Sequence, residues 1–153
     1  MEISKITTLT RTDYQILFSY HKDHIAYNFP DSLYNEKLFH EQLEHDLENA
    51  HAYLFFARDE QDVIQGFLWL RVETDPYKAP QPYRYVDLHY IHVDSQVRSK
   101  GIGSALMEFT HEFAAKKYCK EIRLGTHVQN THAWNLYKKF GFEEYRIVMR
   151  KLL

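Results

Sequence analysis

The chain has 153 residues, of which 44% are hydrophobic and 16% aromatic, and its formal net charge is −2 at pH 7. This length is typical of one folded domain, which we expect over residues 1–153, and the near-neutral charge argues against a nucleic-acid partner. Cys119 is the only cysteine, so an internal disulfide is excluded. No apolar run approaches about 18 residues, so no membrane association is expected. A cytoplasmic location is the simplest interpretation of both observations.

The chain begins with patterns for one strand and one helix. Residues 3–9 alternate loosely between apolar and polar side chains and predict a first strand. Thr12 and Gln15 have the spacing of a capping box, so a helix is expected to begin there. Pro30 closes this region, because proline is poorly tolerated inside a helix.

A second helix is expected over residues 35–49. Apolar residues at helical spacing form its buried stripe: Phe39, Leu43, Leu47 and Ala50. The acidic residues of this helix fall largely outside that stripe. Asp46 is therefore expected to face solvent with the others.

Three strands follow the two helices. Residues 52–57 and 63–72 are rich in aromatic and branched side chains and predict a β-hairpin, in which Gly66 marks a bulge or a close approach of two backbones. A proline-rich loop over residues 74–82 then leads to the longest predicted strand, residues 83–93.

The longest strand has a period of two. One predicted face carries Tyr85, Asp87, His89, Ile91 and Val93. The opposite face carries Val86, Leu88, Tyr90 and His92. This second face is the more apolar and is expected to pack against a helix, while the first presents an acid and an imidazole in the same direction.

The C-terminal part of the chain alternates between helix and strand patterns. Residues 102–117 and 130–140 have apolar side chains at helical spacing, and Gly141 is typical of the residue that ends a helix. Strands are expected over residues 122–124 and 142–153. The predicted order is β-α-α-β-β-β-α-β-α-β, which indicates the α/β fold class, with helices on both sides of a mixed sheet.

The turn before the third helix has the properties of an anion site. Its glycines let the backbone approach a ligand, the helix start presents free N–H groups, and its basic side chains add positive charge. A P-loop is excluded because Lys100 precedes Gly101. A dinucleotide-binding fingerprint is disfavoured because its third glycine position holds Leu106.

Two motifs in this order resemble those of the GCN5-related N-acetyltransferase (GNAT) superfamily. The run Arg98-Ser99-Lys100-Gly101-Ile102-Gly103 is similar to its acyl-CoA signature, Arg/Gln-x-x-Gly-x-Gly/Ala. The run from Asn130 to Phe142 is similar to its second motif, Asn-x-x-Ala-x-x-x-Tyr-x-x-x-Gly-Phe. The resemblance implies a GNAT-like fold with a splayed central sheet, and an N-acetyltransferase that uses acetyl-CoA (CoA) as co-substrate.

The resemblance also implies which residues bind the co-substrate. The pyrophosphate of CoA is expected on the backbone amides of Arg98, Ser99, Lys100, Gly101, Ile102 and Gly103, with Ser104 beginning the helix. The pantetheine arm is expected to pair like an extra strand with Ile91, His92 and Val93. The Val93 amide would polarise the thioester carbonyl, and Asn130 would contact CoA from the other side of the splay.

The implied reaction is a direct transfer, in which a neutral amine attacks the acetyl carbonyl and CoA leaves as a thiolate. Tyr137 stands at the tyrosine position of the family motif, which implies a general acid close to the sulfur; the alternative is a core tyrosine on the apolar face of the last helix. The candidates for the base are Asp87, His89, or a water chain to either of them; the alternative for both side chains is a solvated polar face that lines the cleft.

The acceptor is expected to be a primary amine of a small molecule or peptide. The resemblance places acceptor contacts between the first two helices, where Tyr27, Phe29 and Tyr34 lie; the alternative for each of them is an aromatic side chain that packs the loop. The alternative function is a non-catalytic acyl-CoA-binding module that senses the co-substrate. No metal is expected, because His21 and His24 have no acid or cysteine at ligand spacing. The resemblance is compatible with a homodimer, through a surface that the sequence does not identify.

Overall fold

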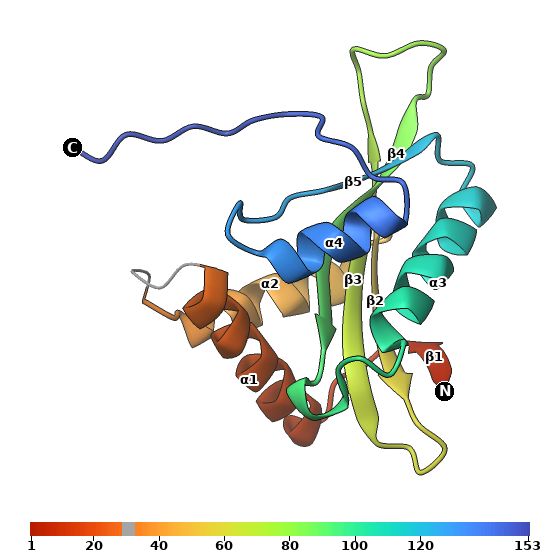
Figure 1. The fold of residues 1–153 in the computed structure, drawn as a ribbon. Helices are drawn as coiled ribbons and strands as arrows, with labels where there is room; N and C mark the ends of the chain where they lie inside the picture. The colour runs from red at the N-terminus through yellow and green to blue at the C-terminus, as the bar shows by residue number, and fades with distance from the viewer. Residues whose placement is uncertain (29–32) are drawn as a thin grey trace.

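The computed structural model describes residues 1–28 and 33–153, so the predicted closure at Pro30 lies outside the described residues. A 3-10 helix, Ser95–Val97, connects β4 to α3. In chain order (Figure 1), the other elements are β1 (Glu2–Lys5), α1 (Arg11–Asn28), α2 (Glu36–Glu48), β2 (Ala52–Arg58), β3 (Ile64–Thr74), β4 (Arg84–Val93), α3 (Ile102–Lys116), β5 (Glu121–Leu124) and α4 (Thr131–Lys139).

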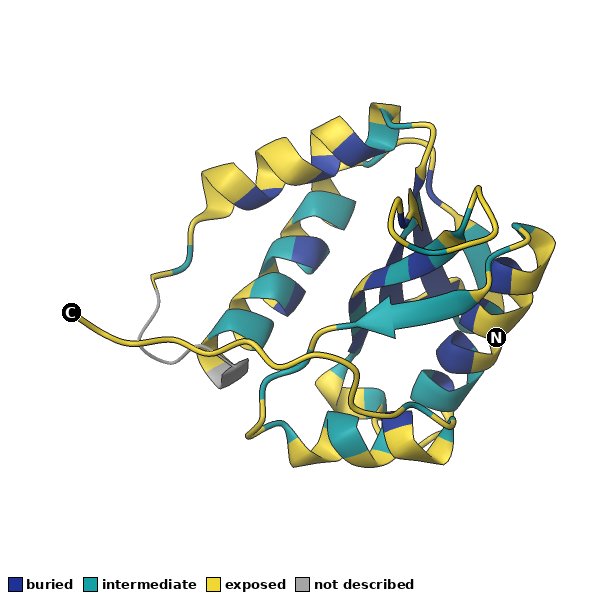
Figure 2. Cartoon of the chain, turned by 90° about the horizontal axis from the view of Figure 1, so that it is seen from above, coloured by how far each residue is buried: buried dark blue, intermediate teal, exposed yellow. Residues whose placement is uncertain are grey.

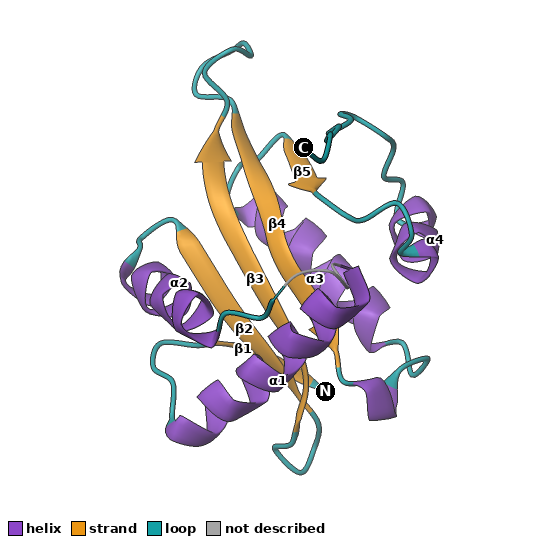
Figure 3. Cartoon of the chain, turned by 90° about the vertical axis from the view of Figure 1, so that its left-hand side faces the viewer, coloured by secondary structure: helices purple, strands orange, loops and turns teal. Residues whose placement is uncertain are grey.

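The strands form one sheet in the order β1-β2-β3-β4-β5. The first four strands pair antiparallel, and β5 pairs parallel to β4. Helices α1 and α2 lie on one side of the sheet, and α3 and α4 lie on the other (Figures 1 and 3). The predicted mixed sheet with helices on both sides is therefore confirmed. β1 is shorter than the strand predicted over residues 3–9, because its ladder with β2 ends at Lys5.

Each face of the sheet has its own apolar core. The core under α3 and α4 includes Leu68, Leu70, Val86, Leu106 and Met107. The core under α1 and α2 includes Leu17, Phe39, Leu43, Phe67 and Trp69. Figure 2 shows the buried strands between the two helical layers. Burial of apolar area, at about 25 cal/mol per Å², holds the helices to the sheet. Among the helices of the described residues, none combines the length and the apolar character needed to cross a membrane.

The first helix begins earlier than predicted. Thr10 Oγ1 accepts a hydrogen bond from the Asp13 N–H at 3.2 Å, and Asp13 Oδ2 accepts one from the Thr10 N–H at 2.9 Å. The Tyr14 N–H donates to the Thr10 carbonyl. The capping box predicted at Thr12 and Gln15 is therefore wrong. The pair Thr10 and Asp13 satisfies the N–H groups at the helix start instead.

Asp46 is buried, with only 2% of its surface exposed, contrary to the prediction. Its Oδ2 accepts hydrogen bonds from Trp69 Nε1 at 2.8 Å and from Arg71 Nε at 2.6 Å, and its Oδ1 lies 3.0 Å from His45 Nδ1. Burial raises the pKa of this carboxyl, but the hydrogen bonds from the three partners outweigh burial and leave the pKa below its usual value. The charge is tolerated there because both oxygens have partners, and it ties α2 to β3.

β4 contains a β-bulge at the position of His89. Trp69 of β3 pairs with Tyr90, whereas the next residue, Leu70, pairs with Leu88. His89 is therefore an extra residue between two consecutive pairs. A bulge of this kind bends the strand and increases its local twist.

The bulge reverses the alternation of side chains along β4. Before the bulge, Val86 and Leu88 are buried in the core under α3 and α4, and after it Ile91 and Val93 pack against that same core. Tyr90 is buried instead in the core under α1 and α2. The faces predicted from the period of two therefore hold through His89 and are wrong from Tyr90 onward, because one extra residue exchanges the two faces.

Helix α4 ends as predicted, but no strand follows it. Gly141 has a φ of 81°, and the N–H groups of Gly141 and Phe142 donate to the carbonyls of Lys138 and Tyr137, which is a Schellman motif. Residues 143–153 are exposed and belong to no strand, so the strand predicted over residues 142–153 is wrong. A strand needs a hydrogen-bonding neighbour, and the described residues supply none to this segment.

Candidate functional site

β4 and β5 separate beyond their shared ladder. The ladder runs from Tyr85 and Glu121 to Leu88 and Leu124, whereas β4 continues through His89–Val93. Within the described residues, His89–Val93 has a neighbouring strand on the β3 side only. Alternate residues there direct backbone N–H and C=O groups to the open side, where an extended ligand with amide groups can pair with them. The splay of the sheet expected from the resemblance is therefore present.

The turn between β4 and α3 leaves the start of α3 without a side-chain cap. Asp94 Oδ1 accepts a hydrogen bond from the Gln96 N–H at 2.8 Å and opens the 3-10 helix. Ser99 and Gly101 have φ values of 65° and 83°, in the left-handed region that favours glycine. Gly101 is the N-cap of α3 and has no side chain that could satisfy the first N–H groups of the helix.

The space in front of this helix start is open. A Cβ atom added to Gly101 would have no heavy atom within 4 Å, whereas one added to Gly103 would lie 3.4 Å from Leu136 of α4. Gly103 therefore allows α3 and α4 to pack closely, and Gly101 borders solvent. Exposed Arg98 and Lys100 flank the same turn. An uncapped helix N-terminus with open space and nearby cations fits the phosphates of CoA.

Gly66 of β3 supports the end of β4. A Cβ atom at Gly66 would lie 2.8 Å from the carbonyl oxygen of His92, which is closer than real Cβ contacts allow. The register between β2 and β3 also shifts beside this residue, between Ala57 and Arg58. The bulge and the close backbone approach predicted for Gly66 are both confirmed. This close approach determines where the end of β4 lies.

Asp87 and His89 lie together on the α1–α2 side of β4. His89 Nδ1 is 3.7 Å from Asp87 Oδ2, and about a third of each side chain is exposed. The His89 ring packs edge-on against Trp69, with 4.7 Å between the ring centroids. The two candidate bases are therefore neighbours that solvent can reach.

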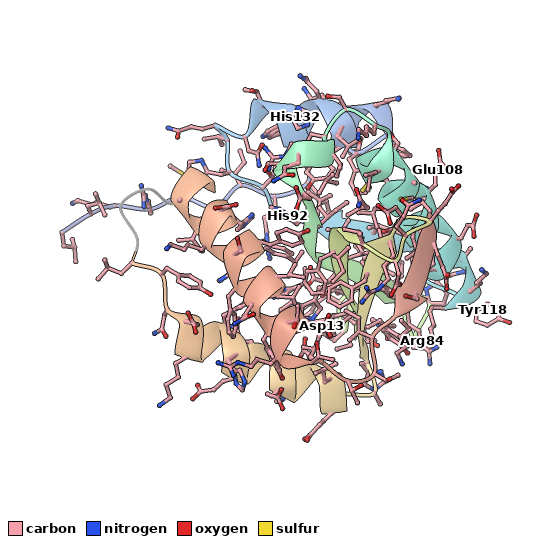
Figure 4. All side chains as sticks on the ribbon, turned by 90° about the horizontal axis from the view of Figure 1, so that it is seen from below. Asp13, Arg84, His92, Glu108, Tyr118 and His132 are labelled. Atoms are coloured by element: carbon pink, nitrogen blue, oxygen red, sulfur yellow. The ribbon has the colours of Figure 1, made fainter. Side chains whose placement is uncertain are left out.

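Side chains of α1 contact the last residues of β4. The Tyr20 ring stacks on His92 at 4.2 Å, and its hydroxyl donates to Asp94 Oδ2 at 3.1 Å. The Tyr90 hydroxyl donates to the Tyr20 carbonyl at 3.0 Å. Burial, together with the charge of Arg98, lowers the pKa of His92 to about 4, so its imidazole is neutral at pH 7. Figure 4 shows His92 beside α1. Sequence reasoning missed these contacts, because no local pattern signals them.

A second group of rings lies next to Tyr90. The His21 ring stacks on Phe39 at 3.9 Å and lies 5.5 Å from the Tyr34 ring, and His24 lies 5.0 Å from Tyr90. Burial and neighbouring imidazoles lower the pKa of His21 to about 4. Burial also lowers the pKa of His24. The α1–α2 side of β4 is therefore lined by aromatic and neutral imidazole groups.

Tyr137 is buried in the core under α4, with 8% of its surface exposed. Burial raises the pKa of its phenol to about 12, so the hydroxyl keeps its proton at neutral pH, as a general acid must. The first turn of the same helix is capped by Asn130, whose Oδ1 accepts a hydrogen bond from the Ala133 N–H at 3.2 Å. The second sequence motif therefore begins and ends at the two caps of α4.

The predicted catalytic residues lie on opposite faces of the sheet. Tyr137 belongs to the core on the α3–α4 side, whereas Asp87 and His89 emerge on the α1–α2 side, beside Trp69. The open end of β4 and the turn into α3 lie between the helical layers (Figure 1). An acid and a base could thus act from two sides on a ligand that lies along this open end.

The remaining predictions concern aromatic and histidine residues of the first two helices. Tyr34 lies against His21, as given above, whereas Phe29 and the side chain of Tyr27 lie outside the described residues. The rings of His21 and His24 are 6.4 Å apart. Within the part of the chain that the structure describes, no group of three or more histidine, cysteine or acidic side chains is arranged to hold a metal.

Comparison with known sequences identifies relatives over most of the chain. A family model described as the acetyltransferase (GNAT) family matches residues 13–142. An N-alpha-acetyltransferase of Sulfurisphaera tokodaii is 30% identical over 98 residues, which cover 61% of this chain and 59% of that protein. N-alpha-acetyltransferase 30 of Saccharomyces cerevisiae is 32% identical over 81 residues, which cover 53% of this chain and 45% of that protein. The chain thus spans about half the length of these curated relatives.

Solved structures of similar fold match the whole chain. The BH1408 protein from Bacillus halodurans, solved as a tetramutant, has a TM-score of 0.84 at 19% identity, over 100% of both chains. AAC(6')-Iy, solved in complex with the bisubstrate analog CoA-S-monomethyl-acetylneamine, has a TM-score of 0.73 at 20% identity, over 99% of this chain and 97% of that one. At these identities the similarity concerns the fold.

Proposed function

The chain belongs to the acetyltransferase (GNAT) family, and from that premise we propose that it moves an acetyl group from acetyl-CoA to a primary amine of a small molecule or peptide. One observation carries the proposal: the sheet opens at the end of β4, directly before the uncapped start of α3. An extended ligand with amide groups along one part and phosphates along another matches these two features. The pantetheine and pyrophosphate of CoA have this chemistry.

The chain's own backbone would hold most of the co-substrate. The amides of Arg98–Gly103 would bind the pyrophosphate, with Ser104 in the first turn of α3. Ile91–Val93 would pair with the pantetheine arm on the open side of β4. Asn130, at the N-terminus of α4, would contact the arm from the opposite side. The open space at Gly101 and the ladder end at Leu88 support this assignment.

Two proton tasks fall to side chains near the end of β4. Acetyl-CoA, when bound, supplies an acetyl thioester, which is an activated acyl donor. The Val93 N–H would donate to the acyl oxygen and stabilise its developing charge. Tyr137 would hold the proton that the leaving sulfur needs, which its raised pKa supports. Asp87 or His89, or a water chain to either, would take a proton from the incoming ammonium group.

The acceptor amine would approach from the α1–α2 side of β4, because Asp87 and His89 emerge there. The surrounding rings are Tyr20, His21, His24, Tyr34 and Tyr90. Because the buried imidazoles among them are neutral, this lining supports an amine carried on an apolar or aromatic group. Small amines, amino-acid derivatives, aminoglycosides and peptide N-termini are the acceptors to compare.

The test is release of free CoA thiol from acetyl-CoA in the presence of an amine panel, at pH values from about 6 to 9. We expect at least one class of primary amine to give thiol release that depends on both substrates. Acetyl-CoA alone should raise the melting temperature, because a ligand that binds only the folded state stabilises it.

Two other results would change the assignment. Tight acetyl-CoA binding without thiol release from any amine would favour the non-catalytic acyl-CoA-binding module. If acetyl-CoA does not raise the melting temperature, both functions are contradicted. Another phosphate-containing ligand would then have to be sought for the anion site.

A further inference from the structure

Asp87, one of the two proposed bases, lies between two arginines of the neighbouring strands. In the strand registers, Arg71 of β3 and Arg123 of β5 are its direct partners. All three side chains lie on the α1–α2 side of the sheet, because the residues that alternate with them pack in the opposite core. Side chains directly opposite each other on one face have Cβ atoms about 5 Å apart, which is close enough for an ion pair.

Arg71 is bound to a carboxylate of another element instead of to Asp87. Its Nε donates to Asp46 Oδ2 of α2 at 2.6 Å, and its guanidinium lies over the Trp69 ring, 5.4 Å from the centroid. Among the described residues, Asp87 forms an ion pair with His89 but not with Arg71. The carboxylate of α2 therefore diverts the cation of β3 from the proposed base.

Arg123 is diverted in the same way on the other side of Asp87. Its Nη2 donates to Asp75 Oδ2 at 2.6 Å, and its Nε donates to Glu121 Oε1 at 3.0 Å. Its guanidinium stacks on the Tyr85 ring at 3.9 Å, which places it on the same face of the sheet as Asp87. Within the described part of the chain, no ion pair joins Arg123 to Asp87.

Stability alone does not explain the buried ion pair of Asp46 and Arg71. Only 2% of the Asp46 surface is exposed, and taking a carboxylate out of water is costly. Well-packed apolar residues can often replace such a pair without loss of stability. The pair therefore points to a further role, and the group that it affects is the carboxylate of Asp87 on the next strand.

An arginine paired with Asp87 would weaken the proposed base. A positive charge beside a carboxylate favours its ionised form, so the carboxylate takes a proton less readily. It would also oppose the positive charge of a protonated His89. The His89 ring packs edge-on against Trp69, whose Nε1 donates to Asp46 Oδ2 at 2.8 Å. Asp46 thus fixes both the ring beside His89 and the cation beside Asp87.

Other titratable groups around the Asp87–His89 pair come from β3, β4, the loop after β3, and α1: Glu73, Tyr85, Lys78 and His21. Lys78 Nζ donates to Glu121 at 3.0 Å. Burial, together with neighbouring imidazoles, lowers the pKa of His21 to about 4, so its ring is neutral at pH 7. Among these described residues, the cations are therefore bound to carboxylates other than Asp87.

We propose that Asp46 and Asp75 are positioning residues that keep two arginines away from Asp87. The Asp87–His89 pair is thereby left able to take a proton from the ammonium group of the acceptor. In that step an N–H bond breaks, its electron pair stays on the nitrogen, and the proton passes to the pair and then to solvent, which reaches about a third of each side chain. This inference rests on the proposed function.

The first test is titration of the His89 imidazole by NMR, which needs neither acetyl-CoA nor an amine. The His89 signal is identified by its absence in His89→Gln. In Asp46→Asn the amide oxygen can still accept from Trp69, but it no longer offers Arg71 a charge, so Arg71 should turn to Asp87. The midpoint of the His89 titration should then move to lower pH by about half a pH unit, since solvent partly screens the pair.

A second substitution separates this effect from a general loss of packing. Asp46→Asn combined with Arg71→Gln should restore the original midpoint, because the released cation is gone, whereas damage to α2 would persist. Asp13→Asn is the matched control. It removes the ion pair with Arg58, which joins α1 to β2 with 3.8 Å between Asp13 Oδ1 and Arg58 Nη2, and should leave the midpoint unchanged.

Asp75→Asn tests the second arginine. It should move the His89 midpoint in the same direction as Asp46→Asn but by less, because Glu121 still binds Arg123. Asp75→Asn combined with Arg123→Gln should restore the original midpoint. A shift of equal size in the single and double variants would contradict the role of Asp75.

The pH–rate profile of kcat/KM for an acetylated amine is the second test. Its acidic limb should move to lower pH in Asp46→Asn, by the same amount as the His89 titration, and should return when Arg71→Gln is added. A profile that stays in place while the titration moves would overturn the inference, because the pair would then not be the base.

The titration alone can also overturn the inference. This happens if the His89 midpoint is the same in Asp46→Asn and in the unchanged protein, or if its shift persists after Arg71→Gln is added. Absence of thiol release from every amine would instead contradict the proposed function. The NMR titration would still decide whether Asp46 keeps the arginine from Asp87, because it requires no acceptor.

Discussion

Phe142 holds Tyr137 by two contacts at the end of α4. The Phe142 N–H donates to the Tyr137 carbonyl at 3.1 Å, and the two rings lie 5.8 Å apart. Both contacts belong to the Schellman motif that Gly141 makes possible with its φ of 81°. The orientation of the proposed acid therefore depends on how the helix ends.

Tyr137→Phe removes the proposed acid while leaving the ring in the core. We expect kcat to fall about 100-fold, because general acid catalysis contributes on that order, while the Kd for acetyl-CoA changes little. Steady-state kinetics and isothermal calorimetry measure the two quantities. Tyr118→Phe, at an exposed tyrosine, is the control. Equal turnover of Tyr137→Phe and the unchanged protein would remove Tyr137 from the mechanism.

Phe142→Ala tests the positioning of Tyr137. Loss of the ring contact should let the last turn of α4 move, so kcat should fall about tenfold while KM for acetyl-CoA stays nearly constant. Phe142→Tyr keeps an aromatic ring at this position and should restore kcat. A loss of melting temperature with normal kcat would mean that Phe142 serves stability alone.

Asp87→Asn and His89→Gln separate the two candidate bases. The variant that removes the base should lose the acidic limb of the pH–rate profile of kcat/KM and should be slower at neutral pH, because that limb reports protonation of the base. The other variant should keep the limb. If both variants keep the acidic limb at its original pH, neither side chain is the base, and a water chain to solvent takes the proton.

Gly101→Val places a branched side chain in the open space where the phosphates would lie. We expect acetyl-CoA binding to be lost and the free energy of unfolding to fall by about 1–2 kcal/mol, because a branched residue is strained at a φ of 83°. Gly125→Ala is the control, since a Cβ there also meets open space but the φ is not in the left-handed region. Binding and the melting-temperature shift with acetyl-CoA measure the effect, and retained binding in Gly101→Val would contradict the pyrophosphate assignment.

The stability of the chain should fall on acidification because of its buried histidines. The pKa of His21 is lowered from about 6.5 in the unfolded chain to about 4 in the fold, so the unfolded state binds more protons between these values. The stability present above pH 6.5 is therefore lost progressively as the pH falls towards 4. His21→Phe keeps an aromatic ring against Phe39 and should reduce the slope of unfolding free energy against pH. Urea unfolding at a series of pH values measures it, with exposed His132→Phe as the control.

The bulge at His89 has a signal in the amino-acid sequence, which is missed when β4 is assigned a strict period of two. The aliphatic residues of β4 occupy even positions at Val86 and Leu88 but odd positions at Ile91 and Val93. This change of phase indicates one extra residue between the two pairs, which is the bulge at His89. The bulge matters because it begins where the β4–β5 ladder ends, and so accompanies the opening of the sheet.

The amino-acid sequence by itself determined the features that depend on neighbouring residues. Helical and strand periods predicted most of the elements, and the two motifs predicted the turn at Gly101 and the helix that ends at Gly141. These predictions succeed because the backbone freedom of a glycine and the apolar stripe of a helix depend only on residues close together in the sequence.

Only the tertiary structure decided the features that depend on contacts between distant segments. Asp46 of helix α2 is buried because Trp69 and Arg71 of β3 supply its hydrogen bonds, and His89 bulges because of the register between β3 and β4. Residues 143–153 have the pattern of a strand but form none within the described residues, because a strand exists only where a neighbour accepts its hydrogen bonds.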